Sequence, residues 1–252
     1  MPGPTAVYVY GIVPGDVVPE EHARGVGDPP CEVRVVRHGE VAALVSEVPV
    51  ERPLGTPDDL TAHARLLDGS AAVAPVLPLR FGAVLTDADA VAKELLASHE
   101  QTLRAALAEL EGRAQFVVKG RYVEQAILRE LLDSDPQARR LREAIRDAPE
   151  DATRNERIAL GELINAAIEQ RRAEDTDRVV AALHALDPLV NPRPPTHEED
   201  AAHVAVLIDL ARQEELEQAL AELARDWQGR VDLSLLGPMA AYDFVASPEP
   251  EG

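Results

Sequence analysis

The sequence predicts an α+β protein, and three observations lead to that fold class. Three strand-like segments precede residue 56, whereas the segments after residue 86 are mostly helical in pattern. Between them lies an apolar stretch at residues 76–85, Val-Leu-Pro-Leu-Arg-Phe-Gly-Ala-Val-Leu, which reads as a strand. From residue 114 onward the order is strand, helices, strand, helix, strand, which is typical of a ferredoxin-like sheet. We therefore expect two domains, a small α+β sheet domain and a ferredoxin-like domain with an inserted long αα-hairpin.

The predicted boundaries are residues 1–112 for the first domain, 113–238 for the second and 239–252 for a C-terminal tail. Composition agrees with a folded core, since 46% of the 252 residues are hydrophobic. Aromatic residues make up only 3%, so Leu, Val and Ala must supply most of that core. The end of the tail, Ser-Pro-Glu-Pro-Glu-Gly, has the composition of a disordered segment.

The net charge and the lack of a targeting segment restrict the functions that this chain can have. The 45 acidic and 25 basic residues give a net charge of −20, and such a field repels phosphate backbones and argues against nucleic-acid binding. We find no basic and apolar leader at the N-terminus and no run near the ~18 apolar residues of a membrane span. The single cysteine, Cys31, fits a reducing compartment and a core position on its strand. We expect a cytoplasmic protein that does not bind membranes.

The first domain should begin with three strands, at residues 6–13, 31–37 and 40–48, with a tight turn at His38-Gly39 between the last two. Thr56-Pro57 then starts a helix, with threonine as the N-cap and proline at the first helical position. We expect that helix to end at about Asp68, before Gly69.

The stretch at residues 76–85 should be a strand at a sheet edge, because Pro78 lacks a ladder donor. Gly82 indicates a bulge or a close backbone approach. Arg80 needs an acceptor nearby, since an unpaired buried charge is costly. Thr86 and Asp89 then resemble a capping box that opens a second helix, which runs to Gly112.

Within that second helix, His99 lies on the apolar stripe and is expected to be a buried histidine without a ligand role. The second domain should start with a strand at residues 114–119. A helix follows from residue 122 and is kinked or restarted at Asp135-Pro136, and a long helix at residues 155–186 completes the hairpin. The charged run at residues 171–175 interrupts its apolar stripe and is expected to face solvent.

The rest of the second domain is predicted from short patterns. Residues 187–200 contain four prolines and should form a loop or edge segment. A near-continuous apolar run marks a central strand at residues 202–210. An amphipathic helix at residues 216–227 and a last strand at residues 231–236 complete the sheet.

No established catalytic motif is present: phosphate-binding glycine loops, Walker-type sequences and G-x-S-x-G elbows are all missing. His197, Glu198, Glu199, Asp200 and His203 supply metal-binding side chains but match no tight zinc spacing. We therefore predict no catalytic residue, no cofactor and no metal. His63 and Arg80 are read as packing or surface groups, although with Tyr10 they would be the polar groups of a pocket if one existed.

Three motifs carry a resemblance to a known family. They are Tyr8-Val9-Tyr10-Gly11-Ile12, then Val76-Leu77-Pro78-Leu79-Arg80-Phe81-Gly82, and finally Gly237-Pro238 followed by Tyr242, Phe244 and Val245. With Gly161-Glu162-Leu163-Ile164 and Glu169-Gln170-Arg171-Arg172, they resemble the gas vesicle protein F/L family over essentially the full chain. The resemblance implies a two-domain α+β fold and a non-enzymatic accessory protein. It also implies that the protein contacts the small shell protein and other accessory proteins during vesicle assembly.

The chain departs from the family pattern in three places. The end motif usually carries Trp and two prolines where this chain has Met239, Ala240 and Ala241. The acidic-aromatic strand near residues 115–119 is only partly matched, and the strand at residues 202–210 lacks the usual aromatic. These departures bear on any partner contact made through those aromatics.

Our leading hypothesis is a non-enzymatic assembly protein of gas vesicles, located in the cytoplasm or on the vesicle. The alternative is a small ferredoxin-like-barrel oxygenase or ligand-binding module with a pocket near Arg80. Arg80, Phe81, Tyr242 and Phe244 are the candidate interaction or domain-docking residues. We expect Tyr242 and Phe244 to pack back near Phe81 and the first domain's sheet, as a strap that fixes the angle between the domains.

Overall fold

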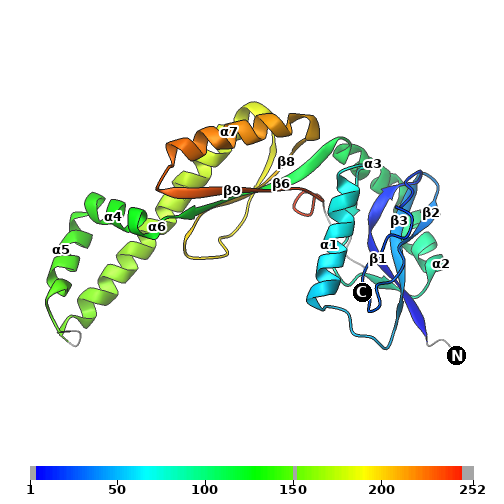
Figure 1. Cartoon of the computed structure of the whole chain (residues 1–252), viewed down its shortest axis with the longest axis horizontal. Coiled ribbons are helices and arrows are strands. Elements are labelled where there is room, and N and C mark those ends of the chain that lie inside the picture. The colour runs from blue at the N-terminus through cyan, green and yellow to red at the C-terminus, as the bar shows by residue number, and fades with distance from the viewer. Residues whose placement is uncertain (1–3, 150–151, 246–252) are drawn as a thin grey trace. The chain divides into compact units, whose positions relative to one another are not determined.

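The computed structural model describes residues 4–149 and 152–245, and its elements are labelled in Figure 1. The fold is mixed α+β with two antiparallel sheets, as the sequence indicates. The chain divides into two compact units. The first contains residues 1–116, 207–211 and 237–252, and the second contains residues 117–206 and 212–236. The division into domains at residues 1–112 and 113–238, with a tail at residues 239–252, stays a prediction.

The first unit is built on a five-stranded sheet. Its strands have the order β2-β3-β1-β4, with β5 also paired to β1. The strands are β1 (Thr5–Pro14), β2 (Arg34–His38), β3 (Val41–Pro49), β4 (Leu77–Pro78) and β5 (Val84–Leu85). The helices are α1 (Pro57–Ala71), α2 (Ala88–Ala90), the π-helical turn Val91–Leu96 and α3 (Glu100–Leu110).

Two apolar clusters cover the two faces of this sheet. Val7 and Val9 of β1 join the cluster formed with residues 91–110, whereas Tyr8 and Tyr10 join the cluster formed with α1. Strict alternation would put Ile12 with the two tyrosines. It lies in the other cluster instead, because the register of β1 against β3 shifts between Val9 and Gly11. Because of this one-residue bulge, the side chains in the second half of the strand point to the opposite faces from those that strict alternation predicts.

Gly11, at the bulge, is required by close packing. A Cβ built at this position would lie 2.8 Å from both Leu67 Cδ2 and the Leu77 carbonyl oxygen. The backbone of β1 can therefore approach α1 and β4 only with glycine at this position.

Helix α1 begins as the sequence predicts. The Thr56 side chain accepts a hydrogen bond from the Asp59 backbone N–H, the Asp59 carboxylate accepts one from the Thr56 N–H, and Pro57 is the first helical residue. The helix continues through Gly69 to Ala71, so the predicted end at Asp68 is wrong. Gly69 has open space around it and a helical backbone, and one glycine lowers helix stability by only about 1 kcal/mol.

The apolar stretch at residues 76–85 is not one continuous strand. It forms two short strands, β4 and β5, which both pair with β1 and are separated by a turn at Phe81 and Gly82. Gly82 has a φ of +95°, which suits a turn rather than the predicted bulge.

The second helix of the first unit also departs from its prediction. Its N-cap is Asp87 and not Thr86. The Asp87 carboxylate accepts a hydrogen bond from the Ala90 N–H at 2.8 Å. The helix then changes from α to π and 3₁₀ geometry before α3 begins. As a result His99 is exposed, with its Nδ1 3.2 Å from the Leu95 carbonyl oxygen, and is not the buried histidine that a regular helix would give.

The other sheet has four strands in the order β7-β8-β6-β9. They are β6 (Arg113–Tyr122), β7 (Leu189–Pro192), β8 (Asp200–Asp209) and β9 (Val231–Met239). The helices of the second unit are α4 (Glu124–Ser134), α5 (Pro136–Arg146), α6 (Arg154–Leu183) and α7 (Gln213–Asp226). The predicted helix break is confirmed: Asp135 ends α4, and its carboxylate caps α5 by accepting from the Gln137 and Ala138 N–H groups. No helix in the described part of the chain is long and apolar enough to cross a membrane.

Candidate functional site

The turn that carries Arg80 and Phe81 lies on the surface of the first unit. Phe81 is half-buried, with its ring centroid 5.7 Å from that of Tyr8 and 5.5 Å from that of His63. Arg80 is exposed, so the expectation that it is buried and needs an acceptor nearby is wrong. The turn directs the guanidinium to water, where an unpaired charge costs little.

Behind the turn, Tyr8 and His63 form a buried polar pair. The Tyr8 hydroxyl lies 2.8 Å from His63 Nδ1 and accepts a hydrogen bond from the Gly82 N–H at 3.3 Å, so it ties the turn to β1 and α1. Burial lowers the pKa of His63, although the nearby Leu79 carbonyl acts in the opposite direction. Burial also raises the pKa of Tyr8. Both side chains are therefore neutral at pH 7.

Tyr10 has its own partners in the same core. Its hydroxyl donates to Ser46 Oγ at 2.9 Å and accepts from the Val26 N–H at 2.9 Å. With Tyr10 fully buried, His63 4% exposed and Arg80 exposed, these three residues do not line a common pocket. The oxygenase or ligand-binding alternative is not favoured by this arrangement.

The C-terminal segment, residues 240–245, packs on the first unit and is fixed there by two side chains. The Ala240 N–H donates to Asp68 Oδ1 at 3.0 Å, and the Asp243 N–H donates to Gln115 Oε1 at 3.0 Å. The Gln115 amide also donates to the Asp243 carboxylate. Burial raises the pKa of Asp68, an effect that the Ala240 N–H partly offsets. This hydrogen bonding sets the path of the last described residues.

Small residues at the start of this segment allow close packing. Ala240 and Ala241 are 0% and 4% exposed and belong to the two apolar clusters of the first unit. Larger side chains at these two positions would need the surrounding core to move.

The two aromatic residues of the segment differ in burial. Phe244 is half-buried against the cluster formed with residues 91–110, while Tyr242 keeps 37% of its surface exposed. Burial and the proximity of Asp68 and Tyr8 raise the pKa of Tyr242, so its hydroxyl stays protonated. The role of these residues as an interaction or domain-docking site stays a prediction. The Ser-Pro-Glu-Pro-Glu-Gly end lies outside the described residues.

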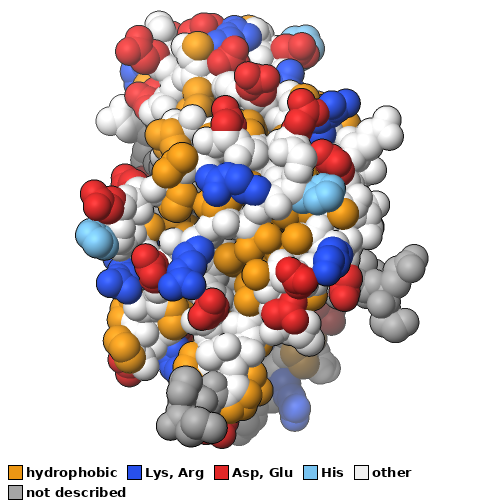
Figure 2. All heavy atoms as spheres, turned by 90° about the vertical axis from the view of Figure 1, so that its right-hand side faces the viewer, with side chains coloured by type: hydrophobic (Ala, Val, Ile, Leu, Met, Phe, Trp, Pro, Cys, Tyr) orange, Lys and Arg blue, Asp and Glu red, His pale blue; other side chains and the backbone are white. Residues whose placement is uncertain are grey.

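We keep the name candidate contact surface for the four predicted residues Arg80, Phe81, Tyr242 and Phe244. Phe81 packs on the cluster formed with α1, whereas Phe244 packs on the cluster of the other face of the sheet, so the expectation that Phe244 packs near Phe81 is wrong. The candidate contact surface combines an exposed cation with partly exposed aromatic groups, the residue types that are enriched where proteins bind one another. Figure 2 shows one face of the molecule, on which hydrophobic side chains are interleaved with acidic and basic ones.

In the second unit, the charged run of α6 is partly buried, contrary to the expectation that it faces solvent. Asp175 is fully buried and accepts from the Tyr122 hydroxyl at 2.8 Å, while Arg230 Nη2 lies 2.9 Å from its Oδ2. Arg230 Nε also contacts Glu130 Oε2 at 2.7 Å, and Arg171 contacts Glu130 Oε1 at 3.1 Å. This ion-pair cluster joins α4, α6, β6 and the turn that ends just before β9. The sequence offered no signal for it, because its members are far apart along the chain.

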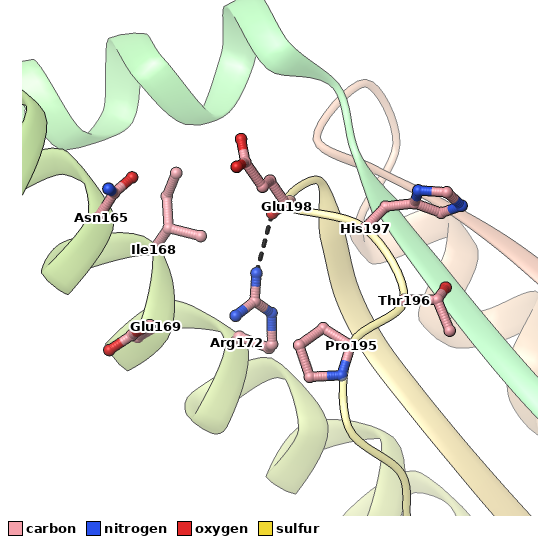
Figure 3. A pocket seen from close by; sticks show the side chains of 8 residues that line it. All are labelled: Asn165, Ile168, Glu169, Arg172, Pro195, Thr196, His197 and Glu198. Carbon is pink, nitrogen blue, oxygen red and sulfur yellow. Dashed lines mark hydrogen bonds between the residues drawn. The ribbon is translucent and has the colours of Figure 1, made fainter.

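An open pocket of about 580 Å³ lies between α6 and the loop before β8. Four residues of α6 line one wall, at helical spacing: Asn165, Ile168, Glu169 and Arg172. The opposite wall is formed by residues 195–198 of the loop. Figure 3 shows the Arg172 guanidinium between the walls. It donates to the Asp200 carbonyl at 2.7 Å and the Glu198 carbonyl at 2.8 Å and so ties helix to loop.

Two side chains of β8, Asp200 and His203, hold this loop in place. The Asp200 carboxylate accepts from the Thr196 N–H, the Thr196 hydroxyl and the His197 N–H, and His203 Nδ1 lies 3.0 Å from the Pro194 carbonyl oxygen. Burial tends to raise the pKa of Asp200, but these hydrogen bonds outweigh it and lower the pKa. Within the described ranges, no three His, Cys, Asp or Glu side chains converge in a way that would hold a metal ion.

Comparisons with known proteins agree on one family. Residues 6–246 match the family described as gas vesicle synthesis protein GvpL/GvpF. A gas vesicle protein F from Streptomyces sp. (strain CB03234) is 36% identical over 245 residues, which are 95% of this chain and 99% of that protein. The gas vesicle protein F of Microcystis aeruginosa (strain PCC 7806) is 24% identical, over 95% of this chain and 97% of the relative.

Solved structures show the same fold. The crystal structure of the gas vesicle protein GvpF from Anabaena sp. PCC7120 matches with a TM-score of 0.79 and 24% identity, covering 95% of this chain and 98% of that one. The crystal structure of GvpF from Microcystis aeruginosa matches with a TM-score of 0.75 and 22% identity, covering 95% of this chain and 98% of that one.

Proposed function

Because this chain belongs to the gas vesicle synthesis protein GvpL/GvpF family, we propose that it is an accessory protein of gas vesicle assembly that catalyses no reaction. Its partner in this proposal is the small shell protein or another gas vesicle protein, met in the cytoplasm or on the vesicle. The family match over residues 6–246 is the observation that carries the proposal.

The candidate contact surface is the place where we propose that this partner binds. Tyr242 and Arg80 are exposed there on a rigid base, since Tyr8 holds the turn and Gln115 holds the C-terminal segment. A rigid surface loses little entropy on binding, which favours affinity. Tyrosine and arginine are also the side chains that most often dominate binding energy at protein interfaces.

We also propose that the second unit is ferredoxin-like. In sequence order its sheet reads β6, then the helices α4 to α6, then β7, β8, α7 and β9. The spatial order β7-β8-β6-β9 is the one that a split β-α-β fold has. In this reading α5 and most of α6 are the inserted hairpin.

Binding to the purified shell protein tests the proposed contact. The Arg80→Ala, Tyr242→Ala double variant should weaken the affinity tenfold or more, because both groups are exposed and would bind the partner directly. A matched control is Arg24→Ala, Leu189→Ala, which removes an exposed arginine and a 51% exposed apolar residue elsewhere. Calorimetric binding and melting curves of all three proteins would be compared.

Two results would contradict the proposal. Equal affinity of the double variant and the control would remove the contact surface from the interface. A deletion strain that makes normal vesicles in normal number would remove the role in assembly itself.

A further inference from the structure

The surface of α5 has a charge opposite to that of the rest of the protein. The helix carries four arginines and one glutamate, a net charge of +3, in a chain whose net charge is −20. Arg140, Arg142 and Arg146 are all exposed. Among the described residues none of the three forms an ion pair, whereas Arg171, Arg178 and Arg230 of the same unit all do.

Packing explains why this surface stays exposed. Helix α5 lies against α6 in the hairpin and buries only Ala138, with Leu141 and Ile145 half-buried on the same side. Arg142 and Arg146 are four residues apart, so they lie side by side along the helix. Arg139 follows the same line but is used within the hairpin, where it donates to the Leu132 and Asp133 carbonyls. Arg140 is two residues from Arg142 and therefore lies on another side of the helix. We define the arginine face as Arg142 and Arg146, whose guanidinium groups are free to meet an acidic surface.

The second unit also carries a surface of the opposite sign. Helix α7 contains five acidic residues and one arginine, a net charge of −4. Its buried side is formed by Leu216 and Leu220, and Glu214, Glu217 and Glu222 are exposed. The two helices are of similar length, 11 residues in α5 and 14 in α7. One copy of the chain thus offers both halves of a charge-complementary contact.

We propose that the arginine face of α5 binds the acidic face of α7 in a second copy of this chain. The contact joins two different surfaces, so it is heterologous and can extend into chains of copies. The overall negative charge does not prevent it, because screening at physiological ionic strength limits each charge to about 8 Å. Exposed ion pairs are individually weak, and the association should therefore be weak and sensitive to salt. This inference does not depend on the shell-protein contact proposed above.

Charge-swapped variants test the contact. The first variant is Arg142→Glu, Arg146→Glu, and the second is Glu214→Lys, Glu217→Lys, Glu222→Lys. Sedimentation would report the weight-average mass at rising protein concentration, relative to the 27.2 kDa of one chain. Wild type should exceed that mass at low salt and return to it in about 0.5 M salt, where the Debye length approaches 4 Å. Each variant alone should stay monomeric, and an equal mixture of the two should associate again.

A matched control separates local contact from net charge. Arg24→Glu, Arg65→Glu changes the net charge by the same amount as the first variant, at exposed positions of the first unit, and should associate like wild type. Circular dichroism would establish that all variants are folded. The proposal is overturned if wild type is monomeric at every concentration, if the mixture stays monomeric, or if the control loses association too. A monomeric wild type that binds polyglutamate would instead assign the arginine face to a different acidic partner.

Discussion

The two units stabilise their interiors in different ways. The first unit buries the neutral groups Tyr8, Tyr10 and His63 on one side of its sheet. Its buried carboxylate, Asp59, accepts hydrogen bonds from three backbone N–H groups around the start of α1 and lies 3.3 Å from Arg52. The second unit buries the charge of Asp175 against Arg230 at the base of its helical hairpin. Neutral groups need only hydrogen bonds, whereas a buried charge needs a counter-charge that stays in position. The stability of the helical hairpin therefore depends on a few charged residues, whereas the stability of the first unit is distributed over many residues.

Removing the buried charge should have the largest effect. Asp175→Ala leaves Arg230 with only Glu130 as a counter-charge and leaves the Tyr122 hydroxyl without its acceptor. We expect a loss of about 3–5 kcal/mol in the free energy of unfolding of the second unit. Urea titration followed by the fluorescence of Trp227, which lies in that unit, would measure it.

The control for this substitution is Arg178→Ala. Arg178 also contacts Asp175, at 3.2 Å, but 58% of its side chain is exposed. Its loss should cost no more than about 1 kcal/mol. Equal effects of the two substitutions would show that the second unit does not depend on its buried pair.

Truncation after Pro238 should have the next largest effect, now in the first unit. It removes the buried Ala240 and Ala241 and the half-buried Phe244, together with the hydrogen bonds to Asp68 and Gln115. We expect the melting temperature to fall by roughly 5–10 °C, since about 2–4 kcal/mol of burial is lost. An unchanged melting temperature together with lost partner binding would show that the segment serves the partner and not the fold.

The smallest effect should be the pH dependence contributed by His63. Because burial lowers the pKa of His63 in the folded state, the unfolded state binds the proton first as the pH falls. Stability should therefore decline as the pH drops below about 6.5, by at most about 1.4 kcal/mol per pH unit, until the folded pKa is reached.

His63→Gln should flatten this part of the stability curve between pH 7.5 and 5, measured by urea titration at each pH. His38→Gln, at an exposed histidine, is the matched control and should keep the wild-type slope. If the two variants have the same slope, His63 is protonated equally in both states and the neutral-core description of the first unit fails.

Much of the fold could be predicted from local patterns. Thr56 and Asp135 mark their helix starts by capping chemistry, and that chemistry needs only neighbouring residues. The predictions failed where contacts between residues far apart in the sequence determine the local structure. The π-helical turn before α3 exposes His99, and the contacts of Asp175 with Tyr122 and Arg230 draw a charged run into the interior.

The candidate contact surface was only partly predictable for the same reason. Phe81 and Phe244 signalled burial by their residue type, and both are half-buried on the first unit. The anchors Asp68 and Gln115 gave no signal in the sequence, because each is defined by a backbone N–H more than 100 residues away.

The bulge in β1 makes the length of that strand as important as its composition. Deleting one residue there would straighten the ladder against β3, yet every side chain beyond the deletion would exchange faces. Ile12 would enter the tyrosine cluster and Val13 would leave it. Conservative substitutions in this strand, except at Gly11, should be tolerated one at a time, whereas single-residue insertions and deletions should be absent from working relatives. Relatives can therefore differ in the residue types of this strand but not in the number of its residues.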